Sequence, residues 1–116
     1  MSAIRLLVNI LYAVLLMAGG LVTLPASPGV GVPDVVLHGL AYGLQAALLF
    51  WLFSSTMRPR GAIVAAVVCA TLFGAMVEIL QLLRPMREVE LKDLCANTVG
   101  ACIVGMVIDL AGRSRS

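Results

Sequence analysis

Four long runs of apolar residues leave this sequence few ways to fold. They cover residues 6–24, 35–53, 61–83 and 94–111. Each reaches the roughly 18 to 20 apolar residues that a helix needs to cross the hydrocarbon core of a bilayer. Only 12% of the 116 residues are charged, whereas a soluble domain is about 25% charged and needs that charge to cover its surface. We therefore predict an all-α, polytopic membrane protein: a single domain, residues 1–116, folded as a bundle of four transmembrane helices.

The first apolar run has a second interpretation. Arg5, the apolar stretch and the following TLPASPG resemble a secretory signal peptide with its cleavage region. The run is longer than the apolar segment of about 7 to 15 residues that is typical of such peptides. We therefore expect an uncleaved helix.

The basic residues predict the orientation of the helices. Lys and Arg near helix ends favour the cytoplasmic side, and acidic residues count little. With both termini in the cytoplasm, five arginines lie inside (Arg5, Arg58, Arg60, Arg113 and Arg115) and three basic residues lie outside (Arg84, Arg87 and Lys92). This bias favours cytoplasmic termini.

Polar residues recur at helical spacing in three of the runs. They are Asp34, His38, Tyr42 and Gln45 in the second run, Glu78 and Gln81 in the third, and Asp93 and Asn97 in the fourth. At about 100° per residue, each set falls on one helix face. An up-and-down bundle brings these sets to the same end and, at about 1.5 Å of rise per residue, to similar depth. Because ionisable groups inside a membrane usually face the bundle interior and mark a site, we predict an outward-facing polar site.

The residue types suggest roles in that site. Glu78 and His38 are candidate catalytic residues that exchange protons, with His38 oriented by Asp34 one turn earlier. The candidate ligand-binding residues are Tyr42, Gln81, Arg84, Arg87, Asp93 and Asn97, and the two arginines suit a phosphate or carboxylate. Simpler roles stay open, because Glu78 can reach the interface by snorkelling and both aspartates can cap their helices.

The motifs D-x3-H-x3-Y, E-x2-Q-x2-R-P-x-R and D-x3-N-x2-G, spread over residues 33–108, together resemble the VanZ-like family of bacterial membrane proteins. The chain departs from the family pattern at Val35, where a lysine is usual, and at Gly39, where a phenylalanine is usual. Any role of that lysine therefore does not carry over. The resemblance implies a multi-pass protein of the bacterial cytoplasmic membrane that serves the cell envelope. The family's namesake is associated with low-level resistance to the glycopeptide teicoplanin, and most members have no assigned activity.

Three classes of function follow. The first is a site that binds or modifies a lipid-linked or polar envelope molecule, and the residues leave open whether a reaction is catalysed. The second is a small transporter, but four-helix multidrug exporters carry their glutamate in the first helix, where this chain has only Asn9. The third is a structural membrane protein whose polar cluster holds the helices together.

Other features point to packing. Gly39 and Gly43 form a G-x-x-x-G pair that suits either the bundle or a homodimer. The three cysteines have no metal-binding spacing. A metal site built from Asp34, His38, Glu78 and Asp93 lacks a paired ligand motif. Apart from the lipid bilayer and an envelope molecule, we therefore expect no metal, no cofactor and no nucleic acid.

Overall fold

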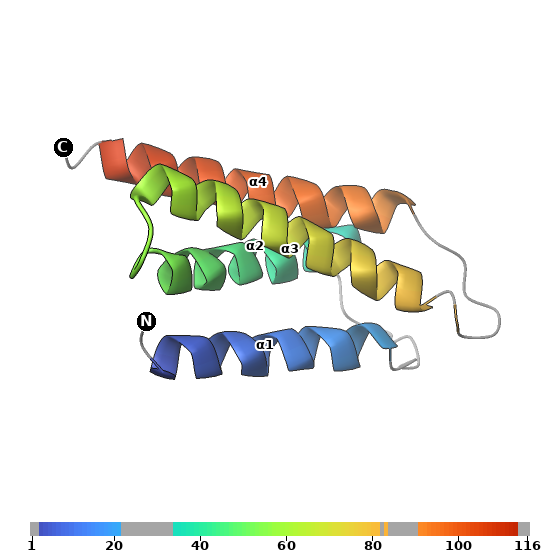
Figure 1. The fold of residues 1–116 in the computed structure, drawn as a ribbon. Coiled ribbons are helices and arrows are strands. Elements are labelled where there is room, and N and C mark those ends of the chain that lie inside the picture. The colour runs from blue at the N-terminus through green and yellow to red at the C-terminus, as the bar shows by residue number, and fades with distance from the viewer. Residues whose placement is uncertain (1–2, 22–33, 82, 84–90, 114–116) are drawn as a thin grey trace.

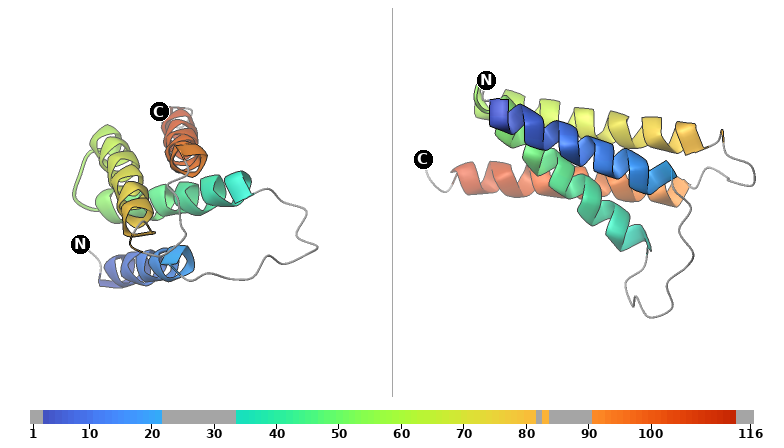
Figure 2. Two further views of the ribbon diagram at one scale, coloured as in Figure 1. Left: turned by 90° about the vertical axis from the view of Figure 1, so that its right-hand side faces the viewer. Right: turned by 90° about the horizontal axis from the view of Figure 1, so that it is seen from below.

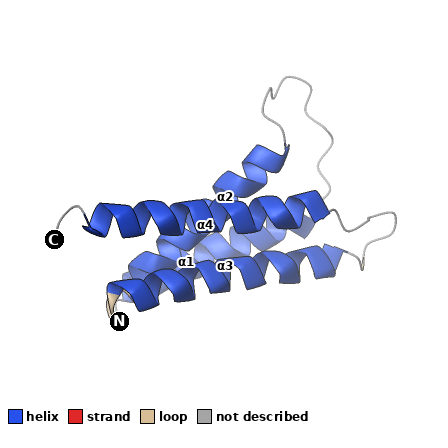
Figure 3. Ribbon diagram, turned by 90° about the horizontal axis from the view of Figure 1, so that it is seen from above, coloured by secondary structure: helices blue, strands red, loops and turns tan. Residues whose placement is uncertain are grey.

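The described part of the chain folds into α-helices, and a short turn joins the second helix to the third (Figure 1). The structure, a computed structural model, describes residues 3–21, 34–81, 83 and 91–113. Its helices are α1 (Ala3–Leu21), α2 (Asp34–Phe53), α3 (Pro59–Gln81) and α4 (Leu91–Arg113). No strand occurs in the described residues (Figure 3). The all-α prediction is confirmed, and every helix begins and ends within three residues of its predicted bounds.

Three of the helices are long and apolar enough to cross a membrane. The segments are Val36–Phe53, Pro59–Gln81 and Leu94–Arg113. Many of their large apolar side chains are exposed, as expected where lipid rather than water is the solvent. The apolar part of α1 covers Ala3–Gly19 among the described residues and is shorter, so a fourth span stays a prediction.

The helices alternate in direction. In Figure 1 the start of α1, the turn between α2 and α3 and the end of α4 lie at one end of the bundle. The start of α2, the end of α3 and the start of α4 lie at the other end, as an up-and-down bundle requires. Helix α2 runs obliquely across the other helices (Figure 2).

The closest helix contact joins α2 and α4 through glycine. A Cβ atom added to Gly100 would meet the backbone of Gly39, and one added to Gly43 would lie 3.2 Å from the carbonyl oxygen of Gly100. Only glycine leaves room for two backbones at this distance. The G-x-x-x-G pair therefore packs the bundle within one chain, and its use between two chains stays a prediction.

Small side chains also form the centre of the bundle. Ala46 of α2, Ala70 of α3 and Ala101 of α4 are fully buried together. Such residues let helices approach closely, which matters in lipid because association there depends on van der Waals packing and hydrogen bonds. The larger apolar side chains are consequently left for the lipid-facing surface.

The α2–α4 contact predicts that Gly100→Ala destabilises the protein. Overpacking costs about 1–3 kcal/mol, which outweighs the gain of up to ~1 kcal/mol from replacing a helical glycine with alanine. Gly112→Ala on the same helix is the control, because an added Cβ there meets nothing within 4 Å. Unfolding in detergent measures both variants, and equal stabilities would contradict the close approach.

Candidate functional site

A cavity of about 210 Å³ lies between α1, α2 and α3. It is at the end of the bundle where α2 begins and α3 ends. Its polar lining residues are His38, Tyr42, Glu78 and Gln81, and its apolar ones are Leu15, Leu16, Gly19, Leu37, Ala41 and Val77. The cavity thus combines an apolar wall with polar groups from two helices.

Helical spacing explains how the polar side chains reach this cavity. His38 and Tyr42 are four residues apart on α2, and Glu78 and Gln81 are three apart on α3, so each pair shares a face. Glu78 is only 4% exposed. A glutamate that snorkels to the interface would have an exposed carboxylate, so Glu78 belongs to the bundle interior.

Asn97 of α4 lies at the edge of this site. It is 1% exposed, and its Nδ2 atom lies 3.0 Å from where a Cβ on Gly74 would be. The Cε1 atom of Tyr42 lies 3.2 Å from the same point. Asn97 therefore packs beside Tyr42, although it does not line the cavity itself.

Two further buried polar atoms lie in the bundle, outside the cavity lining. The Oδ1 atom of Asn97 and the Oε1 atom of Gln45 accept no hydrogen bond from the described residues. Buried acceptors normally have partners, so these two atoms are positions at which a polar group is favoured.

Helix α1 forms one wall and is held by hydrogen bonds to the backbone of α2. Arg5 Nη1 donates to the carbonyl of Trp51 at 2.8 Å, Asn9 Nδ2 to that of Leu48 at 3.0 Å, and Tyr12 Oη to that of Ala41 at 2.6 Å. The Arg5 guanidinium also lies 5.2 Å from the centroid of the Trp51 ring, a cation–π contact. The anchoring of α1 therefore reaches the cavity itself, because Ala41 lines it.

This wall was not predicted from the sequence. Its signal was present, because Arg5, Asn9 and Tyr12 follow one another at spacings of four and three on a single helix face. The apolar lining residues of α1 carry no signal that separates them from its lipid-facing residues.

The remaining predicted site residues are only partly placed. Asp34 begins α2 and Asp93 lies in the first turn of α4, but their side chains are outside the described part. Arg84 and Arg87 also lie outside the described residues. Among the residues that are described, no group of three His, Cys, Asp or Glu side chains could hold a metal ion.

The sequence of α2, α3 and most of α4 decides the family. Residues 36–111 match the VanZ/LLP1 family. The chain belongs to this family. The resemblance read from the motifs is thereby confirmed, and the match includes the four polar lining residues and Asn97, whereas α1 lies outside it. No curated protein and no solved structure gives a significant match to the chain.

The anchoring of α1 predicts that Asn9→Leu weakens the wall of the cavity. The Asn9 side chain donates to Leu48 and to Arg5, and a hydrogen bond between membrane helices is worth about 0.6–2 kcal/mol. We expect the free energy of unfolding in detergent to fall by about 1 kcal/mol. Thr98→Val is the control, because its hydroxyl donates only within α4, to Leu94. An equal effect of both changes would contradict an interhelical role for Asn9.

Proposed function

We propose that this VanZ/LLP1 protein crosses the bacterial cytoplasmic membrane with four helices and both termini inside. Its polar cavity then opens toward the outer face and binds a polar group of a cell-envelope molecule. The observation that carries the proposal is the meeting of His38, Tyr42, Glu78 and Gln81 in one cavity. Ionisable groups inside a membrane are costly and usually mark a site.

The size of the cavity favours a small polar group. Pockets for drug-sized ligands measure roughly 300–1,000 Å³, whereas this one measures about 210 Å³. A headgroup fragment of a lipid-linked molecule therefore fits better than a whole glycopeptide. The molecule's apolar part would stay in the surrounding lipid.

The proposed roles follow the chemistry of each residue. Tyr42 and Gln81 donate and accept hydrogen bonds, and Asn97 supports Tyr42 from α4. If a reaction occurs, Glu78 and His38 supply proton transfer, with His38 oriented by Asp34. In the same proposal Arg84 and Arg87 contact a phosphate or carboxylate, and Asp93 completes the polar rim.

The family supplies the biological setting of the proposal. Low-level teicoplanin resistance is associated with the family's namesake, and glycopeptides act on precursors outside the cytoplasmic membrane. An outward cavity that handles an envelope precursor fits that setting. The position of the cavity at one end of the bundle favours this reading over a transporter, whose exchange site lies near the bilayer midplane.

The functional role of Glu78 is tested by Glu78→Gln in a teicoplanin-sensitive bacterial host. We expect the intact chain to protect this host against teicoplanin and the variant to lose that protection, because glutamine keeps the shape but cannot exchange a proton. The free energy of unfolding of the variant in detergent should be close to that of the intact chain. The control is Asp109→Asn, which removes another helical carboxylate, one that pairs with Arg113 outside this cavity.

The two measurements separate the classes of function. Full protection against teicoplanin by Glu78→Gln would contradict a proton-transfer role for Glu78. A joint loss of protection and stability would favour the structural role of the polar cluster.

The orientation is tested with single cysteines in a variant whose native cysteines are replaced by alanine. Leu83→Cys lies beyond the end of α3 at a residue that is 81% exposed, and Ser55→Cys lies in the exposed turn between α2 and α3. We expect a membrane-impermeant maleimide to label Leu83→Cys in intact cells and Ser55→Cys only after permeabilisation. The reverse pattern would overturn the proposed orientation.

A further inference from the structure

A long groove between α3 and α4 lies at the other end of the bundle from the polar cavity. It consists of two adjoining cavities of about 660 and 620 Å³. The two share Arg60, Ile63, Asp109 and Arg113 as lining residues. We call this continuous surface the α3–α4 groove.

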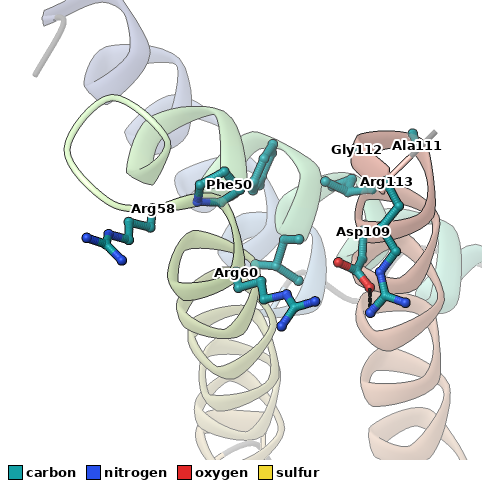
Figure 4. A pocket seen from close by; sticks show the side chains of 10 residues that line it. Phe50, Arg58, Arg60, Asp109, Ala111, Gly112 and Arg113 are labelled. Carbon is teal, nitrogen blue, oxygen red and sulfur yellow. Dashed lines mark ion pairs between the residues drawn. The ribbon is translucent and has the colours of Figure 1, made fainter. Parts of the chain in front are cut away.

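The end of the groove nearest the chain termini is basic. Arg60, in the first turn of α3, extends toward α4, where Arg113 pairs with Asp109 at 3.1 Å (Figure 4). Arg58 also lines this end, but its side chain points away from α4 (Figure 4). Three arginines and one aspartate leave a formal charge of +2 (3 − 1).

Arg58 and Arg60 together give this end its excess charge, because Arg113 pairs with Asp109. Of the two, Arg60 extends toward α4 (Figure 4) and has no ion-pair partner among the described residues. A guanidinium at a membrane–water interface is well suited to a phosphate, which it contacts through two parallel hydrogen bonds. The charge therefore favours an anionic group between α3 and α4.

The rest of the groove is apolar. Its lining residues there are Val64, Val67 and Val68 of α3 and Cys102, Gly105 and Met106 of α4. Val64 and Met106 are 62% and 64% exposed. At Gly105 an added Cβ would lie 2.8 Å from Cγ2 of Val67, so Val67 packs against the α4 backbone and closes the floor of the groove. The space above this floor is the cavity of about 620 Å³, whose apolar lining suits an acyl chain.

We propose that the α3–α4 groove binds an anionic glycerophospholipid. Its phosphate lies between Arg60 and Arg113, and one acyl chain follows the apolar part past Val64 and Met106. The arginines of the groove complement the negative charge of the lipid phosphate, and basic pockets between transmembrane helices bind anionic headgroups. The apolar continuation selects a lipid over a free phosphate. This site is separate from the polar cavity and does not depend on the proposed envelope ligand or on which side faces the cytoplasm.

The test uses the full chain purified in detergent and native mass spectrometry with two lipids of identical acyl chains. We expect phosphatidylglycerol to be retained in preference to phosphatidylcholine. Arg60→Gln should lower retention of phosphatidylglycerol by about fivefold, the effect of losing one basic contact to an anionic lipid. Arg58→Gln removes the same charge two residues away and should lower retention less than Arg60→Gln does, because its side chain points away from α4 (Figure 4). Equal effects of the two changes, or no preference between the lipids, would overturn the proposal.

A second pair of variants tests the apolar part without changing charge. Cys102→Phe fills the groove and should abolish retention of phosphatidylglycerol, whereas Cys95→Phe, on the same helix but outside the groove, should not. Equal retention by both would overturn the acyl-chain placement. Displacement of the lipid by glycerol 3-phosphate would show a site for soluble phosphate instead. A second copy of the chain in the groove, detected as a dimer that excludes lipid, would also refute the proposal.

Discussion

The near contact of the α2 and α4 backbones at Gly39 and Gly100 is the constraint on which the rest of the bundle depends. In lipid no hydrophobic force drives helices together, so close packing and hydrogen bonds must hold them. Helix α3 joins these two helices at the centre, where Ala46, Ala70 and Ala101 meet. The oblique course of α2 follows from the same contact, because α2 crosses α4 closely at the glycines.

The polar cavity lies outside this α2–α4 contact. Asn97 packs against Tyr42 and Gly74 and does not line the cavity. The cavity is lined by residues of α1, α2 and α3. The site is therefore built from α1, α2 and α3 with support from α4. The sequence alone suggested a cluster of α2, α3 and α4.

Most of the fold was predictable because lipid imposes a length and a composition on each helix. The polar cluster was predictable because His38 and Tyr42, or Glu78 and Gln81, repeat with the period of a helix. The wall formed by α1 was marked on one side only: Arg5, Asn9 and Tyr12 share a helix face, but their partners are backbone carbonyls, which every residue possesses, so the pattern does not say which helix they contact. The role of Gly39 and Gly43 was also ambiguous, since a helix within the chain and a second chain can use the same small residues. The α3–α4 groove depends on side-chain directions at the two helix ends, which spacing alone does not fix.

The attachment of α1 has an evolutionary consequence. Its three side-chain donors reach carbonyl oxygens of α2, so nearly any residue at the three acceptor positions supplies the same acceptor. Substitutions in α2 can therefore accumulate without releasing α1, whereas changes at Arg5, Asn9 or Tyr12 have no such freedom. The dependence is one-sided: the attachment constrains the sequence of α1 more than that of α2, and α1 lies outside the segment that matches the family.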